Sequence, residues 1–518
     1  MNLKIHALFI NTKERYDGSR KPEPPPALRA GGGRLPFSRR RIDGPQHIGR
    51  PGYPETALTE ERMRTIMKAK KILAVLLAGA LTVGCFGACT GGGESSKAST
   101  PSKEEGSKAG TSSTETSSKG TTKSDAKLNI WVYGWEKASA DKIKEDTAAY
   151  KEATGVEVTV TPIASDSYST KIQATLAGGT NPDLAFVDAG VQSTQLAAKG
   201  KLLGLNQFGV EEYKEKFYDS VWDTMTYKDD VYGLRITSNN LGLFYNKELF
   251  QKAGLEEPTG DWTWDDLRDA AKKLTDPDNG VYGLDLPVYD KKGGYTWNWL
   301  PFLWQNGGEL LNEERTEAVF NSPEGVEALK FWKTMVQEDK SVPLQAAPTG
   351  VNRFTSGITA MVIDGPWNLN PFLSDPNFKD KFGVAPLPQK ESRATVVGGE
   401  GVVVFSNTKY PQEAYDYLVH LTCSDFVHTF WENWITIPPQ PAEKDFYAND
   451  SMYGPYIQVF SDQMEYSKTR PFTPSWPQIE DTLGIDLQGY MFNKTDDPQA
   501  ALDKAVEDVN KILAEENK

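Results

Sequence analysis

Histidine and cysteine are scarce in this chain of 518 residues, which holds only four His and three Cys. Because zinc centres are built from clustered His and Cys, we expect neither a metal nor a cofactor. Cys85 and Cys89 lie in a leader region and Cys423 lies alone in the body, so no internal disulfide framework can form in the mature domain. We expect Cys423 to be a half-buried thiol on a helix.

Basic residues are in the minority once the N-terminal stretch is set aside. Residues 1–66 carry 13 Lys and Arg against seven Asp and Glu, whereas the remainder carries 44 against 64, a net charge of −20. Nucleic-acid binding needs clustered Lys and Arg to neutralise phosphates, so this acidic body is a poor nucleic-acid binder. It is equally a poor peripheral binder of anionic membranes.

The apolar stretch near the N-terminus is too short to span a membrane. It covers residues 72–84, only 13 positions, against a hydrocarbon core of about 30 Å. Basic residues precede it and two cysteines follow it, a pattern typical of a signal peptide. Residues 67–89 are similar to a bacterial lipoprotein signal, in which a cysteine receives the lipid. We favour Cys89 as the modified residue, with Cys85 as the alternative.

The segments around this signal contribute little to a core, because all 13 Trp lie after residue 130. Residues 1–66 precede an internal Met67, and we interpret them as an over-extended, disordered gene start. Residues 90–126 are mostly Gly, Ser, Thr and Lys, a composition that stays flexible. They would tether a folded body to the lipid on the outer face of the cell membrane.

The body alternates between strand and helix patterns, which predicts an α/β fold. Strands are expected at 128–133, 156–160 and 184–188, and helices at 139–154 and 168–176. This βαβαβ order implies a parallel sheet covered by helices. Ligands of such sheets bind at the carboxyl ends of the strands.

Later segments predict longer helices. Ser322 followed by Pro323 is typical of a helix start. We expect one helix over 410–431 and a last helix that opens at Pro498.

Seven ordered motifs give the body its resemblance to a known family, from about Lys127 to the C-terminus. They are Gly178-Gly-Thr-Asn-Pro-Asp-Leu184, Val231-Tyr-Gly-Leu-Arg235, Leu243-Phe-Tyr-Asn-Lys-Glu-Leu-Phe250, Trp262-Thr-Trp-Asp-Asp-Leu267, Asn306-Gly-Gly308, Phe354-Thr-Ser-Gly-Ile-Thr-Ala-Met-Val-Ile-Asp-Gly-Pro-Trp367 and Phe382-Gly-Val-Ala-Pro-Leu-Pro388. In the order of these motifs, the chain resembles the extracellular sugar-binding proteins that serve ABC importers. These proteins are of the maltose-binding-protein type (bacterial solute-binding protein family 1).

The resemblance implies a two-lobed periplasmic-binding-protein fold of type II, with the ligand in a cleft between α/β lobes. One lobe would hold residues 127–237 plus 400–466, and the other 241–396 plus 471–518. Three crossing hinge segments would lie near 237–242, 396–401 and 466–473. The protein would act as a monomer, would bind a carbohydrate, which we expect to be an oligosaccharide, and would deliver it to the membrane permease subunits of an ABC transporter.

A sugar site needs flat aromatic platforms and a few carboxylates and amides, which the sequence offers independently of the resemblance. Trp367 matches the tryptophan after the family's Gly-x-Trp turn, and Trp297 and Trp476 fall at its other aromatic positions. Each could instead be a core residue. Trp135 is a further aromatic candidate. The polar candidates lie at strand ends or presumed hinges and are Glu136, Asp188, Asn240, Asp364 and Glu400.

Two other functional classes stay open at this point. A secreted glycoside hydrolase or lyase would need a carboxylate pair about 5–10 Å apart, and the sequence alone does not exclude such a pair. A binding protein of the same fold could instead take a peptide or a polyamine. The abundance of Trp favours a sugar, and we expect no catalytic residues.

Overall fold

The computed structural model describes residues 123–133, 137–178, 180–289 and 293–516. All of them belong to one compact unit, Thr114–Lys518. The signal peptide, Cys85, Cys89, Trp135 and Glu136 lie outside the described residues.

The N-terminal strands form the βαβαβ unit that the sequence predicts. The five-stranded sheet has the order β2-β1-β3-β12-β6, in which β1 pairs in parallel with both β2 and β3. The distant strand β12 then joins antiparallel to β3 and β6. The strands are β1 Lys127–Tyr133, β2 Glu157–Ile163, β3 Leu184–Asp188, β6 Gly233–Arg235 and β12 Glu400–Val404.

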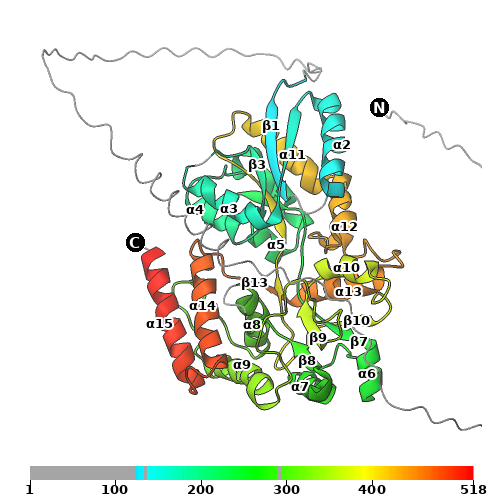
Figure 1. Ribbon diagram of the computed structural model, residues 1–518. Coiled ribbons are helices and arrows are strands. Elements are labelled where there is room, and N and C mark those ends of the chain that lie inside the picture. The colour runs from blue at the N-terminus through cyan, green and yellow to red at the C-terminus, as the bar shows by residue number, and fades with distance from the viewer. Residues whose placement is uncertain (1–122, 134–136, 179, 290–292, 517–518) are drawn as a thin grey trace, which may run out of the picture. The chain divides into compact units, whose positions relative to one another are not determined.

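A second sheet of four strands has the order β10-β7-β9-β8. Strand β7 is antiparallel to β9 and β10, whereas β8 runs parallel to β9. The strands are β7 Gly242–Asn246, β8 Tyr282–Asp285, β9 Thr359–Asp364 and β10 Phe382–Ala385. We call the two sheets, with the helices packed on them, the first half and the second half (Figure 1).

Helices cover both sheets. In the first half α2 packs on β2, α4 on β3 and α11 on β12; in the second half α7 packs on β8, and α14 and α15 run side by side (Figure 1). The helices are α2 Lys137–Thr154, α3 Ser165–Leu176, α4 Gln192–Ala198, α5 Asp219–Asp223, α6 Lys247–Ala253, α7 Trp264–Leu274, α8 Gly293–Gln305, α9 Pro323–Lys333, α10 Leu369–Ser374, α11 Pro411–Cys423, α12 His428–Trp434, α13 Gly454–Asp462, α14 Trp476–Met491 and α15 Pro498–Glu516.

Local sequence signals explain several helix ends. Gly155 adopts φ +87° directly after α2, as expected for a glycine that closes a helix. The Ser322 side chain accepts a hydrogen bond from the Gly325 N–H and caps α9. Cys423 ends α11 as a free, half-buried thiol, as predicted.

The prediction of one helix over 410–431 is wrong. Ser424 is extended, at φ −99° and ψ 170°, and separates α11 from a 3₁₀ turn and α12. Its hydroxyl donates to the His420 carbonyl at 2.6 Å and accepts from the Phe426 N–H at 3.2 Å. A serine that satisfies the end of one helix and the start of the next explains the break.

The chain passes between the two sheets through short segments that pair with one another. Residues 236–241 connect β6 to β7, and Gly398 and Gly399 connect β11 (Thr395–Val397) to β12. Asn239 bridges to Gly398, and β11 pairs in parallel with β13 (Ser467–Thr469). Residues from both sheets therefore converge where these segments cross.

Helix α13 packs against the second sheet, although the predicted division places it with the first lobe. The Tyr456 ring lies 4.9 Å from the Phe382 ring, and the Phe460 ring lies 5.8 Å from that of Phe244. Its residues Ile457 and Phe460 also belong to the core cluster that contains Val402 of the first sheet, so α13 contacts both halves.

Candidate ligand-binding site

A pocket of about 160 Å³ lies where the two sheets meet. Its walls come from the turn after β9, the start of β12, the end of α12 and the segment between β6 and β7. The lining residues are Asn239, Pro366, Trp367, Glu400, Trp434, Ile435 and Thr436. Two indole rings, one carboxylate and one carboxamide thus share a small cavity, which suits a ligand with apolar faces and hydroxyl groups.

Trp367 is the most exposed tryptophan of the pocket, with 41 % of its surface accessible, against 9 % for Trp434. It sits in the 3₁₀ turn Pro366–Asn368 that follows β9. Its ring folds back over Gly365, because a Cβ placed on Gly365 would lie only 2.1 Å from the ring carbon Cζ3. The missing side chain of Gly365 therefore sets the direction of the Trp367 platform.

Substituting Gly365 should move this platform without unfolding the protein. The backbone of Gly365 is extended, at φ −108°, so alanine is tolerated there. The added methyl group would displace the far end of an exposed ring, which is a small cost in stability. We expect Gly365→Ala to weaken ligand binding and to leave the melting temperature within a few degrees of the wild type. A melting temperature that falls sharply, or an unchanged affinity, would contradict this role for Gly365.

Asp364 lies at the end of β9 and is half-buried beside the turn. Burial raises the pKa of its carboxyl group to about 6, although hydrogen bonds from the Gly365 N–H, Asn368 and Trp367 act in the opposite direction. The carboxylate both holds the turn and remains open to a second cavity, described below.

Glu400 opens β12 and is fixed by Thr237 in the segment between β6 and β7. The Thr237 hydroxyl donates to the carboxylate of Glu400 and accepts from its backbone N–H at 2.9 Å. Burial raises the pKa of Glu400, the charge of Asp188 raises it further, and Thr237 and Arg235 partly offset the shift. A carboxylate held this way keeps acceptor capacity for ligand hydroxyl groups.

Arg235 holds the crossing backbone rather than the ligand. Its side chain is buried, and it donates to the carbonyl oxygens of Thr237, at 3.0 Å, and Gly398, and to the Thr224 hydroxyl at 3.0 Å. Gly399 adopts φ +125° beside it, where a Cβ would lie 2.5 Å from the guanidinium. Glycine is required there by both the backbone angle and the space.

Sequence reasoning missed the residues Trp434, Thr436 and Asn239. Trp434 ends α12, and Ile435 follows at φ +48°, a strained conformation for a β-branched residue. The Thr436 hydroxyl donates to the Ser238 carbonyl at 2.6 Å and so ties this end of α12 to the crossing segment. The local sequence, Trp434-Ile-Thr-Ile-Pro438, gives no signal that these residues reach the pocket.

Asn240 points away from the pocket, which corrects its assignment by one residue. It is fully buried, and its amide donates to the Phe460 carbonyl at 2.9 Å and to the Ser467 hydroxyl at 3.3 Å. Side chains alternate along extended backbone, so its neighbour Asn239 faces the pocket instead. Asn240 thus joins crossing segments.

Asp188 and Trp297 meet at Arg470, outside the lining of the Trp367 pocket. Asp188 accepts a hydrogen bond from the guanidinium at 2.8 Å, and the guanidinium carbon lies 4.6 Å from the centre of the Trp297 ring. Glu480 of α14 lies 3.9 Å from the same group. Burial raises the pKa of Glu480 to about 7, and Arg470 limits the shift. This cluster links the end of β3 to the second half.

Trp476 is fully buried at the start of α14, within the core of the second half. A ring without accessible surface cannot stack on a solute in this arrangement, so the structure does not bring Trp476 to the site. Pro477 follows Trp476 in the first turn of α14, but the burial of Trp476 at this helix start had no local signal.

The described residues contain neither a candidate membrane-spanning helix nor a candidate metal-binding cluster. In the described part of the chain, no helix is both long and apolar enough to cross a membrane. Over the same residues, no group of three or more His, Cys, Asp or Glu side chains could hold a metal ion.

The family of bacterial extracellular solute-binding proteins matches residues 134–423, more than half of the chain. The protein therefore belongs to this family, whose solved members share the two-lobed type II fold.

Solved structures support the same assignment. An ABC transporter solute-binding protein from Thermotoga lettingae, bound with α-D-tagatose, is 30 % identical with a TM-score of 0.64; the match covers 75 % of this chain and 100 % of that one. The cyclic α-maltosyl-1,6-maltose binding protein from Arthrobacter globiformis is 28 % identical with a TM-score of 0.66, over 76 % and 100 % of the chains. An ABC substrate-binding protein from Listeria monocytogenes, in complex with cycloalternan, is 26 % identical with a TM-score of 0.63, over 75 % and 99 %.

Proposed function

We propose that this protein captures a carbohydrate outside the membrane and delivers it to the permease of an ABC transporter. The observation that carries the proposal is the pocket in which the exposed Trp367 ring adjoins Trp434, Glu400 and Asn239. Indole rings pack on the apolar CH faces of a sugar, while the carboxylate and the amide bond its hydroxyl groups.

Related proteins support a sugar as the ligand. The three solved structures described above are bound to tagatose, bound to cycloalternan, or named for binding a cyclic maltosyl-maltose. These solutes are neutral carbohydrates. We propose that the present chain also takes a neutral carbohydrate, and that it is an oligosaccharide.

A ligand screen tests the proposal directly. We expect at least one neutral mono- or oligosaccharide to raise the melting temperature in a thermal-shift panel, because binding to the folded state alone stabilises it. Stabilisation by peptides or polyamines, with none by sugars, would favour a different solute. Release of shorter products from any oligosaccharide would favour a glycoside hydrolase or lyase and contradict a binding role without catalysis.

We further propose that the two halves act as lobes that close on the bound sugar. The lobes would comprise 127–237 plus 400–466 and 241–396 plus 471–518, with α13 in contact with both halves. The segments that pair between the sheets supply the hinges, and the protein would work as a monomer beside its permease.

Anchoring by a lipid at Cys89, at the end of the signal region 67–89, completes the proposal. We expect metabolic labelling with palmitate to tag the protein, and Cys89→Ala to abolish the label, because a lipidated cysteine is the attachment point. Cys85→Ala is the matched control and should keep the label. Loss of the label in Cys85→Ala alone would move the anchor to Cys85, and labelling that depends on neither cysteine would refute a lipoprotein.

A further inference from the structure

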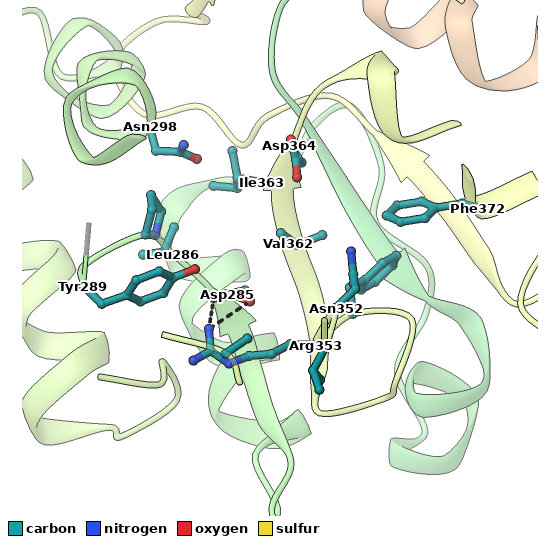
Figure 2. Close-up of a pocket in the computed structure, with 14 residues that line it drawn as sticks. Asp285, Leu286, Tyr289, Asn298, Asn352, Arg353, Val362, Ile363, Asp364 and Phe372 are labelled. Carbon is teal, nitrogen blue, oxygen red and sulfur yellow. Dashed lines mark hydrogen bonds and ion pairs between the residues drawn. The ribbon is translucent and has the colours of Figure 1, made fainter. Parts of the chain in front are cut away.

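A second cavity of about 250 Å³ lies within the second half and reaches Asp364, which precedes the turn that carries Trp367 (Figure 2). It is formed by the ends of β8 and β9, helix α8 and the loop before β9. Its volume equals that of about eight water molecules at about 30 Å³ each, which is room for one sugar ring.

The lining combines an apolar surface with polar groups. Leu286, Val362 and Phe372 contribute the apolar part. Asn298 and Asp364 lie along the upper edge of the cavity in Figure 2, with Ile363 between them, and the Arg353–Asp285 ion pair, at 3.2 Å, lies below. Apolar walls with a few convergent polar groups are typical of small-molecule sites.

Asn298 carries the strongest indication of a ligand. Its side chain is 8 % exposed, and its Nδ2 donates to the Gly294 carbonyl at 3.2 Å, which fixes the orientation of the amide. The remaining oxygen Oδ1 is buried and has no hydrogen-bond partner. Because a buried unpaired acceptor is costly, this atom is suited to a hydroxyl group supplied by a ligand.

Arg353 is the one cationic side chain among the described residues that line this cavity, and it is already engaged in hydrogen bonds. Arg353 pairs with Asp285 and donates to the Gln345 carbonyl, and its guanidinium lies 5.1 Å from the Tyr289 ring. The groups of this cavity that remain for a ligand are two hydrogen-bond acceptors, the Asn298 side-chain oxygen and the Asp364 carboxyl group. Its chemistry therefore fits the hydroxyl groups of a neutral sugar ring.

The two cavities are close along the chain. Asp364 lines the Asn298 cavity, whereas Pro366 and Trp367 line the other pocket. Two residues span at most about 7 Å, so the cavities are separated by little more than the Gly365 turn.

We propose that the Asn298 cavity is a second sugar subsite, so that one ring of the ligand stacks on Trp367 and the next ring bonds Asn298 and Asp364. The proposal rests on the proposed function and adds to it the place where a second ring of the oligosaccharide binds.

Sugars of increasing length, titrated against the full-length protein, test this subsite. The probes are glucose, maltose and maltotriose; mannose, mannobiose and mannotriose; and xylose, xylobiose and xylotriose, each titrated by calorimetry. We expect the disaccharide of the bound series to bind at least tenfold more tightly than its monosaccharide. Equal affinity of monosaccharide and disaccharide in the wild type would overturn the subsite without any variant.

Two variants act on the cavity by different means. Asn298→Leu removes the acceptor at similar volume, and Val362→Phe fills the apolar wall. Each should reduce disaccharide affinity by about five- to a hundredfold and leave monosaccharide affinity unchanged. Unchanged disaccharide binding by folded variants would overturn the subsite while leaving the sugar-binding function intact. Absence of binding by every probe and every sugar of the thermal-shift panel would instead refute the proposed function itself.

Discussion

Replacing Trp367 by alanine is expected to weaken sugar binding by about tenfold to a hundredfold, with little change in stability. Stacking and burial of one aromatic contact contribute on the order of 1–3 kcal/mol, and each 1.4 kcal/mol corresponds to about a tenfold change in affinity. The ring is 41 % exposed, so its removal opens no large cavity in the core.

Calorimetric titration and a melting curve on the same preparation separate the two possible roles of Trp367. Trp→Phe at this position keeps a smaller platform and should lose less affinity than Trp367→Ala. An unchanged affinity combined with a collapsed melting temperature would assign Trp367 to the core and remove it from the site.

Trp476→Ala should have the opposite signature. The ring is fully buried among the residues that pack α14 on α8, so its truncation leaves a cavity. Large-to-small substitutions of buried tryptophan cost about 3–5 kcal/mol of unfolding free energy. We expect a large fall in stability in urea unfolding followed by circular dichroism, and unchanged sugar affinity for the molecules that remain folded. A variant that stays as stable as the wild type but binds sugar more weakly would show that Trp476 belongs to the ligand-binding site.

The contrast between these two tryptophans shows what sequence patterns could and could not supply. Both were expected at the site from the resemblance, and nothing local distinguishes a ring at a turn from a ring at a helix start. The difference arises from tertiary packing: Trp367 lies at the edge between two sheets, and Trp476 faces the interior of one half.

Secondary structure was predictable wherever local signals were strong. The alternation of β1 to β3, the glycine after α2 and the Ser-Pro start of α9 are short-range patterns, and the structure confirms them. The break at Ser424 was missed because the apolar spacing continues through it, whereas the serine caps two helices at once.

The positions of the remaining site residues depend on the register of extended backbone and on contacts between segments that are distant in the sequence. Asn239 and Asn240 differ only in which side of an extended strand they occupy, so an error of one residue exchanged a pocket residue for a buried one. Trp434 lies 67 positions after Trp367 and reaches the pocket only because α12 is tied to the crossing segment at Ser238. Such contacts have no signal in the local sequence.

A crystal structure of the protein with the sugar that gives the largest thermal shift tests the central claim most directly. We expect one ring stacked on Trp367, with hydroxyl groups bonded to Glu400 and Asn239 between the two halves. A sugar bound elsewhere, with the Trp367 ring still open to solvent, would contradict it.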